Sequence, residues 1–200
     1  MVLYHVLVLV GRPLARIAFR PTVRGLEHVP RGGVVVCPNH LSGFDVIAVG
    51  YALGTRPAHH MAKNQLFLRP ILGPFVRALG AFPARAGDGL AGGVGEAAAL
   101  AAAGHVVVIF PEGARRRGRV RRPRGGAARA ALTAGVPLVP VALRGTDDWR
   151  RFRPWTIAFG PPVDLDDLAE QDITEATREA TRRLWERIVG LEAPLDGGAR

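Results

Sequence analysis

The sequence is poor in cysteine, lysine and aromatic residues, and each shortage narrows the class of protein. Cys37 is the sole cysteine, so a framework of disulfide bonds is excluded. Lys63 is the sole lysine, and aromatic side chains make up 6% of the chain. No segment reaches the roughly 20 apolar residues that a membrane-spanning helix needs. Hydrophobic residues still account for 48% of the 200 residues, which excludes a disordered basic tail and predicts one compact domain with a packed core.

Basic side chains outnumber acidic ones, 27 to 17, and the excess is placed unevenly. Residues 1–163 hold 22 basic and 7 acidic side chains, whereas residues 164–200 hold 5 and 10. Seven arginines fall between Arg115 and Arg124 with no acid among them. The acidic end is typical of a solvated helical layer. The cationic body predicts a partner with phosphates, which leaves nucleic acid, an anionic membrane surface and a phosphorylated small molecule open. A coding bias toward arginine would produce a similar excess, so a merely solvated arginine loop is the alternative.

The first 20 residues form an apolar segment that ends in spaced arginines. Met1–Gly11 contains no Lys, Arg, Asp or Glu, and Arg12, Arg16 and Arg20 then interleave with apolar residues. This pattern suits a helix lying in a membrane interface, and it equally suits an apolar helix that covers the domain core. We expect residues 1–20 to be a membrane-associating helix. The missing basic n-region and cleavage site argue against a signal peptide.

After this segment, short β-rich runs alternate with helical stretches, which predicts an α/β fold: a single domain with a largely parallel central sheet flanked by helices. We expect the domain over residues 21–190 and a frayed tail over 191–200. The expected strands are 23–26, 33–37, 58–62, 81–84, 106–110, 138–144 and 156–159. The expected helices are 44–53, 65–79, 90–103, 125–134 and 174–189.

Two expected strands are continuous apolar runs that end in proline and polar residues. The run Val34–Val36 leads into Asn39 and His40, and the run Val106–Phe110 leads into Glu112. Continuous runs fit central strands that are covered on both faces. Since ligands bind beyond the carboxyl ends of strands in open α/β sheets, both segments lie where a site is expected.

His40 and Asp45 form the first candidate constellation. His40 lies just beyond a strand and Asp45 falls in the first turn of the next expected helix, so a bend can bring the carboxylate to the imidazole. That contact would fix the tautomer and leave the other ring nitrogen to take a proton from a hydroxyl. The alternative is structural, with Ser42 and Asp45 capping the helix while His40 bonds a loop carbonyl. Ser42 lacks the Gly-x-Ser-x-Gly context of a hydrolase nucleophile, and no spacing indicates a metal site.

Two further segments place charged side chains after strands. Glu112 and Gly113 precede Arg115, so the acid either holds arginines in place for a phosphate or merely bridges a surface arginine. Gly80–Arg85 is a short strand that ends in a cation. Arg85 suits a phosphate monoester, because its fork offers two hydrogen bonds and a charge that does not titrate, while a solvated surface side chain is the alternative.

In this order and spacing, the segments resemble the glycerolipid acyltransferase family typified by 1-acyl-sn-glycerol-3-phosphate acyltransferase. The resemblance runs from about residue 23 to residue 163. Residues 39–45 match the family's NHx4D motif, and Phe110–Gly113 matches its FPEG motif. Gly80–Arg85 lies where the second motif falls, and Val136–Val141 resembles the fourth.

This resemblance implies transfer of a fatty acyl group from an acyl thioester to the free hydroxyl of 1-acylglycerol 3-phosphate, which gives phosphatidic acid in phospholipid biosynthesis. The thioester would be carried on coenzyme A or on acyl carrier protein, as a co-substrate. Another lysolipid or a glycolipid acceptor is the alternative within the family. Because a thioester is already activated, we expect no cofactor, no metal and no covalent enzyme intermediate.

By the same resemblance, His40 is the general base and Asp45 orients it. The residues expected to bind the acceptor are Arg85, Glu112, Gly113 and Arg115, and the supporting residues are Asn39, Ser42, Phe110 and Pro111. The chain departs from the family's pattern in three ways: Ala114 replaces a threonine, Arg85 lies one position before the family's arginine, and the arginine run is unusually basic. Within that run only Arg115 matches a motif position, so we interpret the other arginines as contacts to anionic headgroups.

The charge distribution and the apolar N-terminus place the protein on the cytoplasmic face of the cell membrane, as a peripheral or monotopic protein. Its expected partners are the lysophospholipid acceptor, the acyl thioester donor and an anionic membrane surface. A basic module that binds nucleic acid is disfavoured, because aromatic residues do not interleave with the arginines. A catalytically silent family member that binds lipid is the remaining alternative.

Overall fold

The computed structural model describes residues 2–84, 92–116 and 122–196, and in this part of the chain seven strands form one sheet. The strand order is β1-β7-β6-β2-β5-β3-β4. The strands are β1 (Thr22–Arg24), β2 (Val34–Pro38), β3 (Ala58–Lys63), β4 (Phe82–Ala84), β5 (Val106–Val108), β6 (Leu138–Arg144) and β7 (Thr156–Phe159). Among the described pairs only β6 and β7 run antiparallel, which confirms the largely parallel sheet.

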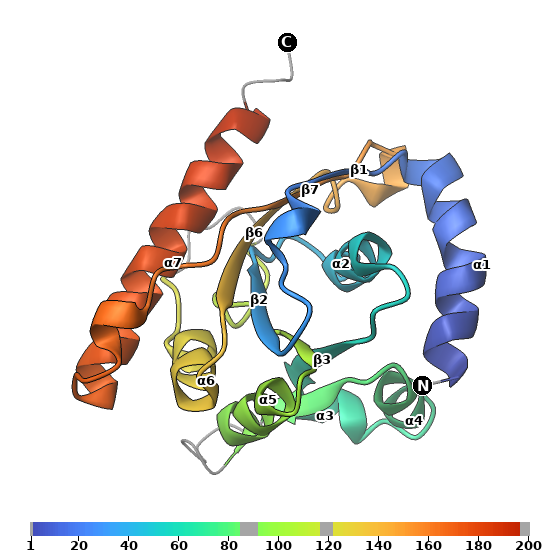
Figure 1. Cartoon of the computed structure of the whole chain (residues 1–200). Coiled ribbons are helices and arrows are strands. Elements are labelled where there is room, and N and C mark those ends of the chain that lie inside the picture. The colour runs from blue at the N-terminus through green and yellow to red at the C-terminus, as the bar shows by residue number, and fades with distance from the viewer. Residues whose placement is uncertain (1, 85–91, 117–121, 197–200) are drawn as a thin grey trace.

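Helices cover both faces of the sheet (Figure 1). On one face lie α5 (Gly93–Ala102), α6 (Gly126–Ala134) and α7 (Ile173–Asp196). On the other face lies α2 (Asp45–Leu53), with α1 (Val2–Phe19) outside it. Two short helices, α3 (Asn64–Phe67) and α4 (Leu72–Ala78), connect β3 to β4. The α/β fold with a single sheet flanked by helices is therefore confirmed.

The central strands are buried because their side chains alternate between two apolar cores. Val35 and Val107 belong to the core under α5, α6 and α7, whereas Val34, Val36 and Val106 belong to the core under α2. Each of these five residues is at most 1% exposed. A strand with apolar side chains on both faces has to be continuous in hydrophobicity, which is how these runs appear in the sequence.

The prediction of a single helix over residues 65–79 is wrong. The chain forms α3 and α4 instead, with a break between Phe67 and Leu72. Pro70 explains the break, because it has no amide hydrogen for a helical bond and its ring disfavours the helical conformation at Arg69.

The C-terminal helix is longer than expected. Residues 191–196, expected to belong to a frayed tail, form the last turns of α7, which ends at Asp196. Packing holds this end of the helix in place: Ile188 is fully buried, and Leu191 lies against Gly160 at the sheet. A single proline, Pro194, does not end the helix in this setting.

The N-terminal helix contacts the domain at its C-terminal end and also midway along, where the guanidinium of Arg12 lies over the ring of Tyr51 at 5.2 Å. The ring of Phe19 stacks on Trp155, with 4.0 Å between the centroids and 10° between the planes. Other apolar side chains of α1 face outward, and Leu9, Leu14 and Ile17 are 75%, 62% and 79% exposed. No helix in the described part of the chain is long and apolar enough to cross a bilayer.

Candidate active site

The candidate site lies at the edge of the sheet where β2, β5 and β6 end. These three neighbouring strands are parallel, so their carboxyl ends open at the same edge. The loop after β2 carries Asn39 and His40 and leads into Asp45 at the start of α2. The loop after β5 carries Glu112, and the loop after β6 carries Thr146. Residues that are far apart in the sequence therefore meet around His40.

His40 and Asp45 are in direct contact. The Nδ1 atom of His40 lies 2.8 Å from Oδ2 of Asp45, and the side chain of His40 is 18% exposed whereas that of Asp45 is fully buried. The bend that this contact requires falls between β2 and α2, where α2 begins at Asp45 itself. A carboxylate on Nδ1 holds the proton there and leaves Nε2 as the basic nitrogen.

Asp45 holds the loop as well as the imidazole. Its Oδ2 atom accepts the backbone N–H groups of Leu41 at 2.7 Å and Ser42 at 2.9 Å, and its Oδ1 atom accepts the hydroxyl of Thr146 at 2.5 Å. The carboxylate of Asp45 therefore accepts amides ahead of α2 and also contacts the imidazole. The alternative, in which His40 bonds a loop carbonyl and the side chains cap the helix, is wrong: His40 bonds Asp45, and the N-cap residue of α2 is Phe44, which has no side-chain capping bond. Thr146 is fully buried, and nothing in its sequence context marked it as part of the site.

Ser42 has a structural role in this loop. Its hydroxyl donates to the backbone carbonyl of Thr146 at 2.8 Å and accepts the N–H of Phe44 at 3.0 Å. The side chain is buried, and its hydrogen bonds fix the turn that brings His40 to Asp45.

The FPEG segment supports His40 from the neighbouring strand. The ring of Phe110 stacks on the imidazole with 4.2 Å between centroids. Glu112 is almost completely buried, and its Oε1 atom accepts the backbone N–H of His40 at 3.0 Å and Nε of Arg116 at 2.8 Å. Burial raises the pKa of Glu112, against the opposing effects of the His40 amide and Arg116. Glu112 thus holds the loop of residues 39–44, the histidine loop, in place through its bonds to the His40 amide and to Arg116.

Arg116 lies in the site and not among contacts to headgroups, so the prediction made for it is wrong. Its guanidinium pairs with Glu112 at 2.8 Å and with Glu192 of α7 at 2.8 Å. Its backbone N–H also donates to the carbonyl of His40 at 2.9 Å, and its guanidinium lies over the ring of Trp185 at 5.4 Å.

The structure describes two of the three other residues expected to bind the acceptor, Arg115 and Gly113. Arg115 is exposed, and within the described residues its side chain has no hydrogen bond or ion pair. Gly113 adopts a positive φ of 66°, and the Nε atom of Arg124 lies 2.9 Å from where a Cβ would stand. Arg85 lies outside the described residues.

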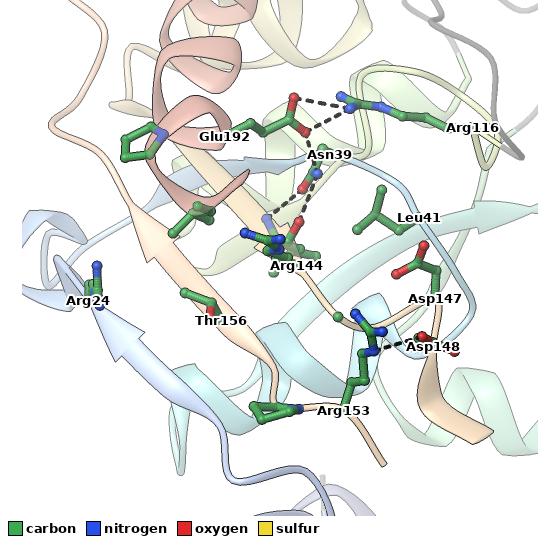
Figure 2. A pocket seen from close by; sticks show the side chains of 15 residues that line it. Arg24, Asn39, Leu41, Arg116, Arg144, Asp147, Asp148, Arg153, Thr156 and Glu192 are labelled. Carbon is green, nitrogen blue, oxygen red and sulfur yellow. Dashed lines mark hydrogen bonds and ion pairs between the residues drawn. The ribbon is translucent and has the colours of Figure 1, made fainter. Parts of the chain in front are cut away.

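A polar cleft of about 680 Å³ opens beside the histidine loop (Figure 2). Asn39 and Leu41, which flank His40 in the chain, form part of its wall, and so do Arg116 and Glu192. Its other basic residues are Arg24, Arg144 and Arg153, contributed by β1, β6 and the loop before β7. Since these arginines are single residues in separate strands and loops, no local motif in the sequence points to them.

Comparisons with known families, sequences and structures bear on this site. A profile of the Acyltransferase family matches residues 20–144, which include the NHx4D and FPEG segments. The 1-acyl-sn-glycerol-3-phosphate acyltransferase of Bacillus subtilis is 30% identical over 174 residues, which cover 85% of this chain and 87% of that protein. The enzyme of the same name from Streptococcus pneumoniae is 28% identical over 146 residues, covering 70% of this chain and 53% of that protein.

The fold comparison agrees. The crystal structure of the 1-acyl-sn-glycerophosphate acyltransferase PlsC from Thermotoga maritima is similar with a TM-score of 0.68 and 22% identity, covering 93% of this chain and 80% of that chain. The chain therefore belongs to the Acyltransferase family, and the resemblance seen in its motifs is confirmed. It is an enzyme of the acyl-transferring class.

Proposed function

We propose that this protein transfers a fatty acyl group from an acyl thioester to the free hydroxyl of 1-acylglycerol 3-phosphate and so produces phosphatidic acid for phospholipid biosynthesis. The observation that carries this proposal is the His40–Asp45 pair, 2.8 Å apart at the open edge of the sheet. The name of the B. subtilis relative, which aligns over most of both chains, supports the choice of acceptor. Coenzyme A and acyl carrier protein are both candidate carriers of the thioester.

The reaction requires the proton of the acceptor hydroxyl to be removed as its oxygen attacks the thioester. A lipid hydroxyl is a poor nucleophile at neutral pH, so His40 Nε2 takes its proton as the oxygen attacks the thioester carbonyl carbon. Asp45 stabilises the imidazolium that forms, because its carboxylate already accepts the Nδ1 proton. When the tetrahedral intermediate collapses, the carbon–sulfur bond breaks and the thiol leaves with the proton that His40 held. Atoms and charges balance without a covalent enzyme intermediate.

The basic residues near the pair are suited to phosphorylated substrates. Arg24, Arg144 and Arg153 line the cleft, and arginine forks form paired hydrogen bonds with phosphate oxygens. Arg115 belongs to the same proposal through its motif position, and its exposed side chain is open to a ligand. Arg85 is included because it lies in the segment where the second motif falls, one position before the family's arginine.

We also propose that the enzyme works on a membrane surface, where its lipid substrate resides. The exposed apolar side chains of α1 are joined by those on and beside α4, where Leu68, Ile71 and Phe75 are 75%, 87% and 43% exposed. Residues 1–26 and 46–87, which contain these elements, hold no Asp or Glu. An apolar surface without negative charge suits a leaflet with anionic headgroups.

The catalytic proposal is tested by thiol release from palmitoyl and oleoyl thioesters in the presence of 1-acylglycerol 3-phosphate. His40→Ala should reduce turnover by about 10³-fold, within the range for removal of a general base. His105→Ala is the matched control, because His105 is exposed in the loop before β5, away from the carboxyl ends of the strands. Wild-type turnover by the His40 variant would refute the mechanism, and a panel of other lysolipids would test the acceptor.

The membrane proposal has a separate test, co-sedimentation with vesicles that contain anionic phospholipid. Leu9→Glu combined with Ile71→Glu should reduce the bound fraction severalfold, whereas Val189→Glu, an exposed apolar position on α7, should not. If high salt releases the wild type, charge dominates the attachment, and retention until detergent is added would indicate that α1 is inserted. Equal binding by all three proteins would contradict the proposed surface.

A further inference from the structure

The carboxylate of Glu192, on the last turns of α7, is bound at the site as an anionic ligand would be. Its Oε1 atom accepts a hydrogen bond from the side-chain amide of Asn39, and both its oxygens lie near Nη1 of Arg116, at 2.8 and 3.0 Å. Figure 2 shows these three side chains converging at one end of the cleft. An amide and a guanidinium that share one carboxylate also offer the donors that a phosphate oxygen accepts.

This position adjoins the proposed catalytic residue. Asn39 directly precedes His40, and the backbone N–H of Arg116 donates to the carbonyl of His40 at 2.9 Å. Both side chains, together with Glu192, form part of the wall of the 680 Å³ cleft. An anion bound there would thus be held against the segment that carries the general base.

Arg116 is shared by two carboxylates, and only one of them can be replaced easily. The side chain of Glu112 is fully buried, whereas those of Arg116 and Glu192 are 21% and 17% exposed to solvent. Glu112 already balances the charge of Arg116, so Glu192 adds a negative charge that an incoming phosphate would meet. One guanidinium atom of Arg116, Nη2, is buried and has no partner among the described residues, so Arg116 is not fully hydrogen-bonded while Glu192 is in place.

Glu192 lies on the last turns of α7, directly after Leu191, which packs against Gly160. Gly190 and Pro194 flank Glu192, and both residues weaken a helix, since glycine adds backbone freedom and proline removes a hydrogen bond. The preceding turns are anchored by Leu184 and Ile188, which are fully buried. Displacing Glu192 therefore requires a change of its side-chain rotamer, or of the turn beyond Leu191, while the preceding turns stay packed.

We propose that Asn39 and Arg116 form a phosphate-binding position and that Glu192 occupies it as a built-in competitor until a phosphorylated substrate displaces it. The ligand class is a phosphate monoester, either that of the acceptor lipid or the 3′-phosphate of a coenzyme A donor. This assignment of the ligand rests on the proposed function. The contact makes the free enzyme partly self-inhibited, because the substrate that carries this phosphate has to displace the carboxylate of Glu192.

Direct binding tests the inference without requiring turnover. Calorimetric titration of sn-glycerol 3-phosphate, and separately of adenosine 3′,5′-bisphosphate, is compared between the wild type, Glu192→Gln and Glu186→Gln. The glutamine keeps the size of the side chain and removes the charge. Glu186 is the matched control, because it lies on the same helix, is 61% exposed and pairs with Arg182 of that helix.

Glu192→Gln should bind at least one of the two probes about tenfold more tightly, as removal of a like charge at contact distance predicts, while Glu186→Gln should match the wild type. The probe that responds identifies the substrate whose phosphate is bound. In turnover, KM for that substrate should fall with kcat retained. Unchanged or weaker binding of both probes by Glu192→Gln overturns the inference, and so does a loss of kcat at unchanged KM, which would make Glu192 a residue that positions Arg116. If no variant transfers acyl groups, the proposed function fails, and the titrations still decide the inference.

Discussion

Thr146 provides the sharpest test of how the histidine loop is held, because its side-chain hydroxyl bonds directly to the carboxylate of Asp45. Its hydroxyl donates to Oδ1 of Asp45 at 2.5 Å, across 101 positions of the chain. The other carboxylate oxygen has three partners of its own: the imidazole of His40 and the amides of Leu41 and Ser42. Thr146→Val removes the hydroxyl with almost no change in volume and leaves Oδ1 without its partner.

The expected loss follows from the kind of bond. A hydrogen bond to a charged group contributes about 1.5–3 kcal/mol, and a buried oxygen left without a partner bears the full cost of desolvation. Thr146 and Asp45 are both 0% exposed, so water cannot substitute without rearrangement. We expect Thr146→Val to lower the free energy of unfolding by about 2 kcal/mol. The carboxylate is then free to rotate away from the imidazole, so turnover should fall about tenfold, which corresponds to roughly 1.4 kcal/mol in the barrier.

Denaturant titration and the thiol-release assay measure the two effects. Thr181→Val is the control: its hydroxyl is also largely buried, but it donates to the carbonyl of Thr177 within α7, so the loss of stability should be small and turnover unchanged. Thr146→Ser keeps the hydroxyl and should restore most of the activity. If Thr146→Val unfolds and turns over like the wild type, the Asp45 carboxylate does not depend on this bond and our account of the loop is wrong.

Three further perturbations test other parts of the structure. Gly113→Ala should lower stability by about 1–2 kcal/mol in denaturant titration, since its φ of 66° is strained for alanine and the new Cβ would lie 2.9 Å from Nε of Arg124; an unchanged midpoint would refute that conformation. Burial lowers the pKa of His60 to about 4, whereas a histidine in the unfolded chain has a pKa near 6.5. Between these two pH values the unfolded chain binds a proton that the folded protein does not bind, so the free energy of unfolding should fall by about 3 kcal/mol as the pH drops from 6.5 to 4. His60→Leu should lose that part of the pH dependence. If the wild type and this variant lose stability in parallel as the pH falls, His60 is not the group responsible. Phe19→Ala removes the stack on Trp155 and should cost about 2 kcal/mol and expose α1 to limited proteolysis, whereas an unchanged cleavage pattern would show that α1 is held elsewhere.

The sequence allowed the sheet and the two motif segments to be predicted because the signals there are local. Val34–Val36 and Val106–Val108 are continuous apolar runs, which is typical of central strands covered on both faces. His40 reaches Asp45, five residues later, through a bend in the loop between them. The break in the helix expected over 65–79 also has a local cause, because Pro70 lacks the amide hydrogen that a continuous helix needs.

What the sequence could not indicate is long-range. Thr146, Arg116 and Glu192 lie around His40 only because the strands are ordered as they are and because α7 crosses the same edge. Arg116 and Arg115 are adjacent and identical in type, yet the first is partly buried and held in ion pairs and the second is exposed. Only the direction in which the loop after β5 turns distinguishes them, and composition carries no information on that direction.

The separation of these contacts along the chain has a consequence for how the protein is made. Asn39 bonds to Leu143, 104 positions later, and to Glu192, 153 positions later, so the loop that carries His40 cannot be completed while the chain is still short. Since synthesis runs from the N-terminus, α1 leaves the ribosome long before β6 and α7 exist. The apolar segment is therefore available to a membrane at a stage when the site has not formed, and we expect nascent chains to attach before they become active. Ribosome-bound chains that end near residue 130 should already co-sediment with vesicles and show no acyl transfer.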